Sequence, residues 1–261
     1  MIIKPSVTIS LTASLLLAGP LQASIALNFG AIFNPLFGTP GNLTQPYASV
    51  APGINATLTA ATPFSSLTPT NNGSVLGDIR VNAANTTNVN MTVALWDATA
   101  GNGFVAPYNP GGSYSWAFGF FDIDGGAGTY DVVTVYTPGT YTVSSSTALV
   151  ITIGTGVAFS GIASAEIPGQ AGITTLTPAQ ADVAAIYTVS NTSSINFDYT
   201  VGVSGIPFAT GRNLLIDGND LMEGLVSYGP VTETFIPEPS ALLLASLGAC
   251  LFVTRRKISR S

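Results

Sequence analysis

Apolar and polar residues alternate along several stretches in the middle of the chain, and this period-two pattern predicts β-strands with one buried face. The clearest stretch, 88–95, has apolar residues at every second position: Val89, Met91, Val93 and Leu95. Trp96 would then fall on the polar side. The stretch 113–120 carries the most aromatic face of the chain: Tyr114, Trp116, Phe118 and Phe120. Residues 194–203 repeat the alternation, and we expect all three faces to lie in a core.

Turn-forming residues separate these stretches, so that strands recur every 8 to 14 residues. Further strands are predicted at 55–60, 75–81, 130–136, 140–144, 148–153, 213–216 and 224–228. Residues 27–69 are rich in proline and glycine turns and predict an irregular approach with one or two edge strands. Short strands with regular turn signals predict an all-β fold, an antiparallel sandwich or jelly-roll-like body.

One short helix interrupts this pattern. Thr177 offers an N-cap, Pro178 the first helical position and Gln180 the capping-box position, and residues 181–186 continue the helix. Residues 229–235 are interpreted as a linker. We therefore expect one exported domain, 27–230, followed by a linker and tail at 231–261.

Residues 1–23 have the composition of a secretory signal peptide. Lys4 precedes an apolar stretch at 7–18 that would form the signal helix, and a Gly-Pro break follows. Small residues then fit a cleavage site after residue 23 or after residue 26. An uncleaved N-terminal anchor is the alternative.

The last twenty-six residues combine three features in a fixed order. A Pro237-Glu238-Pro239 triplet precedes an apolar stretch at 241–253, and four cations follow: Arg255, Arg256, Lys257 and Arg260. As a helix the apolar stretch spans roughly 20 Å, less than the ~30 Å hydrocarbon core. The cations resist translocation and favour a cytoplasmic C-terminus. The pattern predicts a short transmembrane helix, either a transient stop-transfer element or an ordinary single-span anchor.

This tail resembles the PEP-CTERM sorting signal of Gram-negative bacteria, in which a Pro-Glu-Pro motif precedes a short transmembrane helix and an Arg-rich end. The resemblance covers about a tenth of the chain and leaves the fold of the body open. It implies recognition by an exosortase, a membrane transpeptidase-like enzyme expected to cut near the motif and pass the body to the cell surface or exopolysaccharide matrix. By this resemblance Pro237, Glu238 and Pro239 are the recognition residues. The prolines also favour the extended backbone that protease-type recognition needs.

The body between the two end signals is acidic and nearly free of cations. Arg80 and Arg212 stand against twelve acids, a net charge of −10. Nucleic acid is excluded as a partner because phosphate binding needs clustered cations. Charged residues make up 8% of the chain, against ~25% in typical domains. The surface must therefore be built from Thr, Ser, Asn and Gly, which suits a hydrated sugar matrix or packing against other surface proteins.

Histidine is absent, and the single cysteine, Cys250, lies in the apolar tail. These two facts exclude His-dependent triads and zinc sites, and they exclude disulfides within the body. No cofactor is expected, with one candidate exception. Asp122 and Asp124, with Asp131 across a hairpin, are candidate calcium ligands, although the loop lacks EF-hand spacing. A second acidic loop runs from Asp217 to Glu223.

Two further chemistries stay open. Asp122 and Asp124 would lie ~6.5–7 Å apart on one side of a strand, which is compatible with a carboxylate-based hydrolase without indicating one. Four aromatic residues could form a sugar-stacking platform: Trp96, Trp116, Tyr108 and Tyr114.

We expect a non-enzymatic exported protein of the cell surface or extracellular matrix, bound at least transiently to the membrane and to an exosortase during sorting. A carbohydrate-binding module associated with exopolysaccharide is the alternative, and a hydrolase is the weaker one.

Overall fold

The computed structural model describes residues 23–29, 43–60, 74–75, 78–83, 88–126, 128–167, 176–203, 212–218 and 228–235. Most of the predicted signal peptide, the Pro-Glu-Pro motif, the apolar stretch and the basic tail lie outside these ranges, as do residues 219–223 and most of the predicted strand at 224–228. No helix within the described ranges has the length and apolar character needed to cross a membrane.

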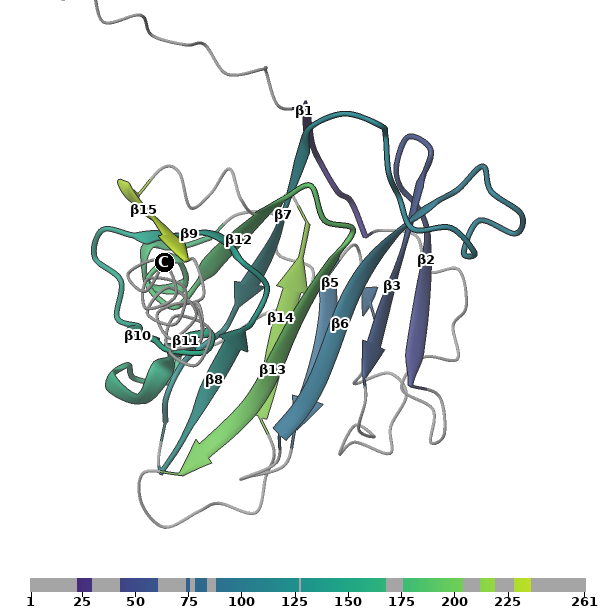
Figure 1. Ribbon diagram of the computed structural model, residues 1–261. Helices are drawn as coiled ribbons and strands as arrows, with labels where there is room; N and C mark the ends of the chain where they lie inside the picture. Colours follow the sequence, from purple (N-terminus) through teal and green to yellow (C-terminus); the bar gives the residue numbers. More distant parts are fainter. Residues whose placement is uncertain are drawn as a thin grey trace, which may run out of the picture.

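The described residues form mostly β-strands arranged in two sheets (Figure 1), which confirms the all-β prediction at this level. The eight-stranded sheet has the order β15-β9-β12-β7-β14-β5-β4, with β1 added beside β7. The seven-stranded sheet has the order β10-β11-β8-β13-β6-β3-β2. Neighbouring strands are antiparallel throughout, apart from the parallel pair β1–β7.

The strands of the eight-stranded sheet are β1 (Ala23–Ile25), β4 (Ser74–Val75), β5 (Asp78–Ala83), β7 (Tyr114–Phe121), β9 (Gly139–Ser144), β12 (Ala185–Ser190), β14 (Arg212–Asp217) and β15 (Pro230–Phe235). Those of the seven-stranded sheet are β2 (Thr44–Ala51), β3 (Ile54–Ala60), β6 (Asn88–Asp97), β8 (Thr129–Val135), β10 (Val150–Ile153), β11 (Val157–Ser160) and β13 (Ser194–Val203). Within the described ranges two short helices accompany them, the 3-10 helix η2 (Gly161–Ala163) and α1 (Pro178–Ala181).

One apolar core is shared by the two sheets. The alternation predicted for β6 and β13 is present, with every second side chain buried along both strands. Phe118 and Phe120 of β7 contact Phe197 of β13, with ring centroids 6.3 and 5.0 Å apart. These contacts join the inner faces of the two sheets, because β7 and β13 belong to different sheets. Trp96 lies on the half-exposed face of β6, as predicted, and donates a hydrogen bond to Thr57.

The aromatic strand β7 is buried on more than its inner face. Ala117 and Phe121 lie on the opposite face, where they join a second apolar cluster with Leu176, Ala181, Ala184, Ile186 and Leu215. The segment around α1 therefore covers this outer face of the eight-stranded sheet. The ring of Phe121 lies over Gly119, where a Cβ would approach the ring to 2.4 Å, so that a larger residue at 119 would have to displace the ring.

The predicted helix at 177–186 is correct at its start and wrong in its length. Thr177 and Gln180 form the expected capping box with Pro178 in the first turn. The helix ends at Ala181, and residues 185–190 form β12, which pairs with β7 on one side and β9 on the other. Pairing along both edges outweighs the helical propensity of an alanine-rich segment.

The prediction of a linker at 229–235 is also wrong. Residues 230–235 form β15, the edge strand beside β9, and Phe235 is fully buried in the core. The described part of the predicted irregular approach at 27–69 contains two strands. β2 is an edge strand, as predicted, whereas β3 lies between β2 and β6. β11 was not predicted.

Candidate functional site

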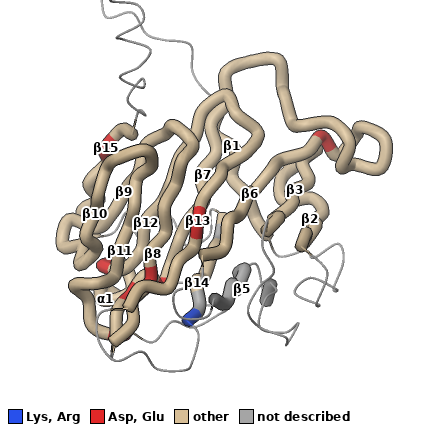
Figure 2. Tube along the Cα trace, turned by 60° about the horizontal axis from the view of Figure 1, so that its bottom comes forward, with Lys and Arg blue, Asp and Glu red and all other residues tan. Residues whose placement is uncertain are grey.

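Charged residues are sparse along the described trace, which has red segments near β8 and a blue segment at one end of β14 (Figure 2). The Arg212 cluster consists of Asp124, Asp131, Tyr199 and Arg212. Asp131 lies on β8, Tyr199 on β13 and Arg212 at the start of β14, while Asp124 follows the end of β7. The cluster therefore ties the two sheets together through polar side chains.

Strand alternation places two of these side chains in the interior. Asp131 occupies a core-facing position of β8, between Thr129 and Val133, and Tyr199 occupies one of β13. Asp131 pairs with Val201 in the sheet, which brings Tyr199 within reach on the same face. The hydroxyl of Tyr199 donates to Oδ1 of Asp131 at 2.6 Å.

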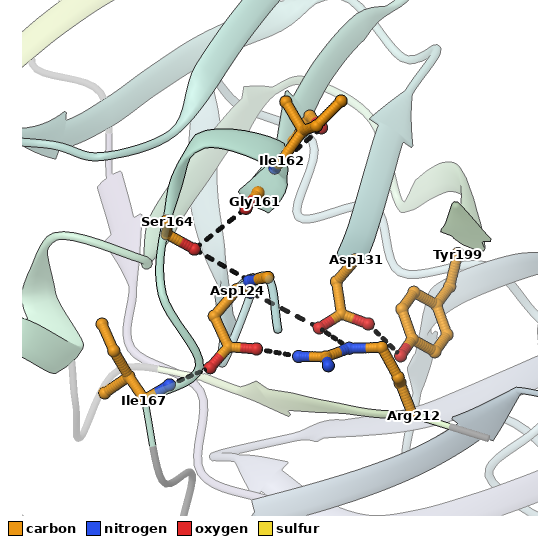
Figure 3. Close-up of polar contacts among 10 residues, drawn as sticks. Asp124, Asp131, Gly161, Ile162, Ser164, Ile167, Tyr199 and Arg212 are labelled. Carbon is orange, nitrogen blue, oxygen red and sulfur yellow. Dashed lines mark hydrogen bonds and ion pairs between the residues drawn. The ribbon is translucent and has the colours of Figure 1, made fainter. Parts of the chain in front are cut away.

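Arg212 binds both carboxylates. Its Nε donates to Oδ2 of Asp131 at 2.9 Å, and its Nη2 forms an ion pair with Oδ1 of Asp124. Figure 3 shows the guanidinium between the two carboxylates, with Tyr199 beyond Asp131. The side chains of Asp124 and Asp131 are 2% and 1% exposed and that of Arg212 is 14% exposed, so solvent screens these ion pairs little.

The backbone around Asp124 completes the cluster. The amide of Ile167 donates to Oδ2 of Asp124, and the amide of Asp131 donates to the carbonyl of Asp124 at 2.8 Å. Gly161 of η2 approaches Asp124 so closely that a Cβ at position 161 would lie 2.4 Å from the Asp124 carbonyl carbon. The loop before β8 and the helix η2 thus fix the position of this carboxylate (Figure 3).

Burial dominates the ionisation of the cluster. It raises the pKa of Asp124 to about 6 and that of Asp131 to about 7, and the charge of Arg212 opposes both shifts. Burial also lowers the pKa of Arg212, but the two carboxylates raise it by more. Burial, together with Asp131, raises the pKa of Tyr199 well above its usual value, so that Tyr199 remains a hydrogen-bond donor.

The predicted calcium ligands are brought together only in part. Asp124 and Asp131 converge, but on the guanidinium of Arg212, which is already a cation. Asp122 is partly exposed and adopts a left-handed backbone, with φ 64°. Among the residues that the structure describes, no group of three or more acidic or cysteine side chains is placed to hold a metal ion. The second acidic loop lies largely outside the described residues.

The predicted sugar platform does not form an exposed strip. Trp116 is fully buried and donates from Nε1 to the carbonyl of Thr192 at 2.7 Å. Tyr114 is 5% exposed, and Tyr108 packs edge-on against it at 5.6 Å. An open hollow of about 630 Å³ lies beside these tyrosines, lined mainly by glycine, serine, threonine and asparagine.

A second hollow lies on the outer face of the seven-stranded sheet. It has a volume of about 390 Å³ and is lined by residues of β3, β6 and β13 and by Tyr136. We call it the outer-face hollow. Its polar residues were visible in the sequence only as the outward positions of 88–95 and 194–203. Their convergence depends on the order β8-β13-β6-β3, which the sequence pattern does not contain.

Comparisons with protein families, with curated proteins and with solved structures found no match for this chain. The resemblance of the C-terminal tail to a sorting signal therefore stays a prediction from its residues.

Proposed function

We propose that the chain is an exported structural protein of the cell surface or extracellular matrix, delivered there by its C-terminal tail. The observation that carries this proposal is the order of features in the tail sequence: Pro237-Glu238-Pro239, then an apolar stretch, then four cations. Under the proposal, an exosortase recognises the triplet while the basic end remains in the cytoplasm.

The body suits a structural role. Its two sheets share a core rich in aromatic residues, and we propose that they form an antiparallel β-sandwich with a jelly-roll-like path. The outward positions of β6 and β13 carry mainly uncharged polar side chains, and Thr142 and Thr232 of the other sheet form a hydrogen-bonded pair. Such a surface exchanges hydrogen bonds readily with a hydrated polysaccharide matrix.

A carboxylate-based hydrolase is the weaker alternative. The convergent acids Asp124 and Asp131 are nearly inaccessible and both are bound by Arg212, so neither is free to protonate or attack a substrate. A carbohydrate-binding module is the stronger alternative, and the outer-face hollow is the observation that favours it.

The sorting proposal is tested by changing Arg255, Arg256 and Lys257 together to Gln in a bacterium that carries an exosortase. We expect loss of retention and of surface display, measured by fractionation of a tagged chain with intact-mass analysis of its C-terminus. The matched control is the charge-conserving variant Arg255→Lys/Arg256→Lys/Lys257→Arg, which should be sorted normally. Unchanged display and processing of the Gln variant would contradict the proposal.

A further inference from the structure

The outer face of the seven-stranded sheet carries a connected network of polar side chains. Asp198 of β13 lies opposite Asn90 of β6 on one side and opposite Thr134 of β8 on the other. Its carboxylate accepts hydrogen bonds from Asn90 at 2.5 Å, from Asn88 at 3.1 Å and from the hydroxyl of Tyr136 at 2.8 Å. Asp198 is therefore held in one orientation from both sides, by β6 and by Tyr136, the residue that follows β8.

The network continues along the strands on either side of Asp198. Thr92 donates to the side-chain oxygen of Asn196 at 2.8 Å, and Thr200 donates to that of Asn88 at 3.1 Å. Side chains on an ordinary solvated sheet face sample several rotamers and lose that freedom on binding a ligand. Here the hydrogen bonds have fixed them before any ligand arrives, which lowers the entropic cost of binding.

This network forms the wall of the outer-face hollow. The residues that line it are Thr59, Asn90, Met91, Thr92, Tyr136, Asn196, Phe197 and Asp198. Met91 and Phe197 are core residues, so the groups presented to a ligand are hydroxyls, amides, one carboxylate and one aromatic ring. Tyr136 is 39% exposed although its hydroxyl is anchored to Asp198, so part of its ring is accessible at a fixed angle.

These groups match the chemistry of a neutral sugar. An ionised carboxylate has about four acceptor positions, and Asp198 uses three of them within the network, which leaves capacity for a ligand hydroxyl. Amides and hydroxyls both donate and accept, as sugar hydroxyls require. An exposed aromatic ring offers an apolar surface to the C–H face of a pyranose. No cation is among the described residues that line this hollow, and the one charge among them is that of Asp198, which would repel an acidic sugar.

We propose that the outer-face hollow is a binding site for a neutral saccharide, with the Tyr136 ring as stacking surface and Asp198 as hydroxyl acceptor. The inference deepens the proposed matrix function, on which it rests for the origin of the saccharide. Asn90, Thr92 and Asn196 supply further hydrogen bonds around the ring. A shallow site of this size fits a short stretch of a longer sugar chain.

The test measures binding of the purified full chain in detergent to soluble neutral oligosaccharides, with gluco-, manno- and galacto-hexaoses as probes and tri-galacturonate as the acidic comparison. We expect at least one neutral probe to bind. Tyr136→Ala should weaken that binding at least about tenfold by removing the ring, and Asp198→Asn about tenfold by removing the charged acceptor. Tyr136→Phe keeps the ring and should weaken it only about two- to threefold.

Tyr130→Ala is the matched control, because Tyr130 lies on the same face of the same sheet, six residues before Tyr136, or roughly 20 Å along the chain. It should bind as the unaltered protein does, and thermal melts should show that each variant is folded. Three results would overturn the proposal: no neutral probe binding up to about 10 mM, equal binding by Tyr136→Ala and Tyr130→Ala, or binding confined to tri-galacturonate. Because the assay is done on purified protein, a sorting defect would leave its outcome unchanged, and the two proposals fail separately.

Discussion

Replacing Arg212 by methionine removes the cation that two buried carboxylates share. Asp124 and Asp131 are 2% and 1% exposed, so neither can recover the lost interaction from water. Breaking a buried ion pair by removing one partner costs about 3–5 kcal/mol. We therefore expect Arg212→Met to lower the free energy of unfolding by about 4 kcal/mol at pH 8. This is a large share of the roughly 5–15 kcal/mol that a domain has in total.

The penalty should depend on pH in a defined direction. Burial already raises the pKa of both aspartates, and loss of the guanidinium raises the pKa of each further. Near pH 5 both carboxyls take up a proton in the folded state and the uncompensated charge disappears. The deficit of Arg212→Met relative to the unaltered protein should therefore shrink to about 1–2 kcal/mol at pH 5.

Urea unfolding followed by tryptophan fluorescence measures both values, since Trp116 is fully buried and reports loss of the core. Two variants serve as controls. Arg212→Lys keeps the charge but not the planar fork and should lose only about 1–2 kcal/mol. The triple variant Asp124→Asn/Asp131→Asn/Arg212→Met removes every charge of the cluster and should recover most of the loss. A loss below about 1 kcal/mol at pH 8, with no change at pH 5, would refute the idea that this cluster ties the sheets together.

Three further predictions concern the body. The unaltered protein should melt at a higher temperature at pH 5 than at pH 8. The reason is that the raised pKa values of Asp124 (about 6) and Asp131 (about 7) contribute stability that is lost as pH rises through 6–7. A higher melting temperature at pH 8 would show that the ion pairs outweigh the cost of burying the carboxylates. Phe235→Ala should lower the free energy of unfolding by about 3 kcal/mol because its ring is buried in the core, whereas Thr234→Ala, at an exposed neighbour, should change it little. Equal, small losses in both variants would show that residues 230–235 behave as a linker. Adding a chelator should leave the melting temperature unchanged, because Arg212 already neutralises Asp124 and Asp131, and a clear drop would instead support the calcium hypothesis.

Local pattern was sufficient for the strands whose two faces differ most. β6 and β13 were predicted from alternation alone, because a strand that buries one face must place apolar residues at every second position. The capping box before α1 was equally local, since Thr177 and Gln180 interact within one turn. Elements without such a signature were mistaken or missed. β15 has five exposed residues of six and a single core contact at Phe235, so nothing in its composition separates it from a linker.

The sequence by itself determined that the body is acidic and without histidine, and it indicated the β-strands that dominate the described residues. It also predicts that the two ends are export signals. Only the tertiary structure decided which side chains meet. Asp131 and Arg212 are 81 residues apart, and Asn90 and Asp198 are 108 apart. Periodicity fixes which face of a strand is buried, but the partner across that face depends on strand order. Strand order is a property of the whole chain, because it is set by the burial of all the strands together.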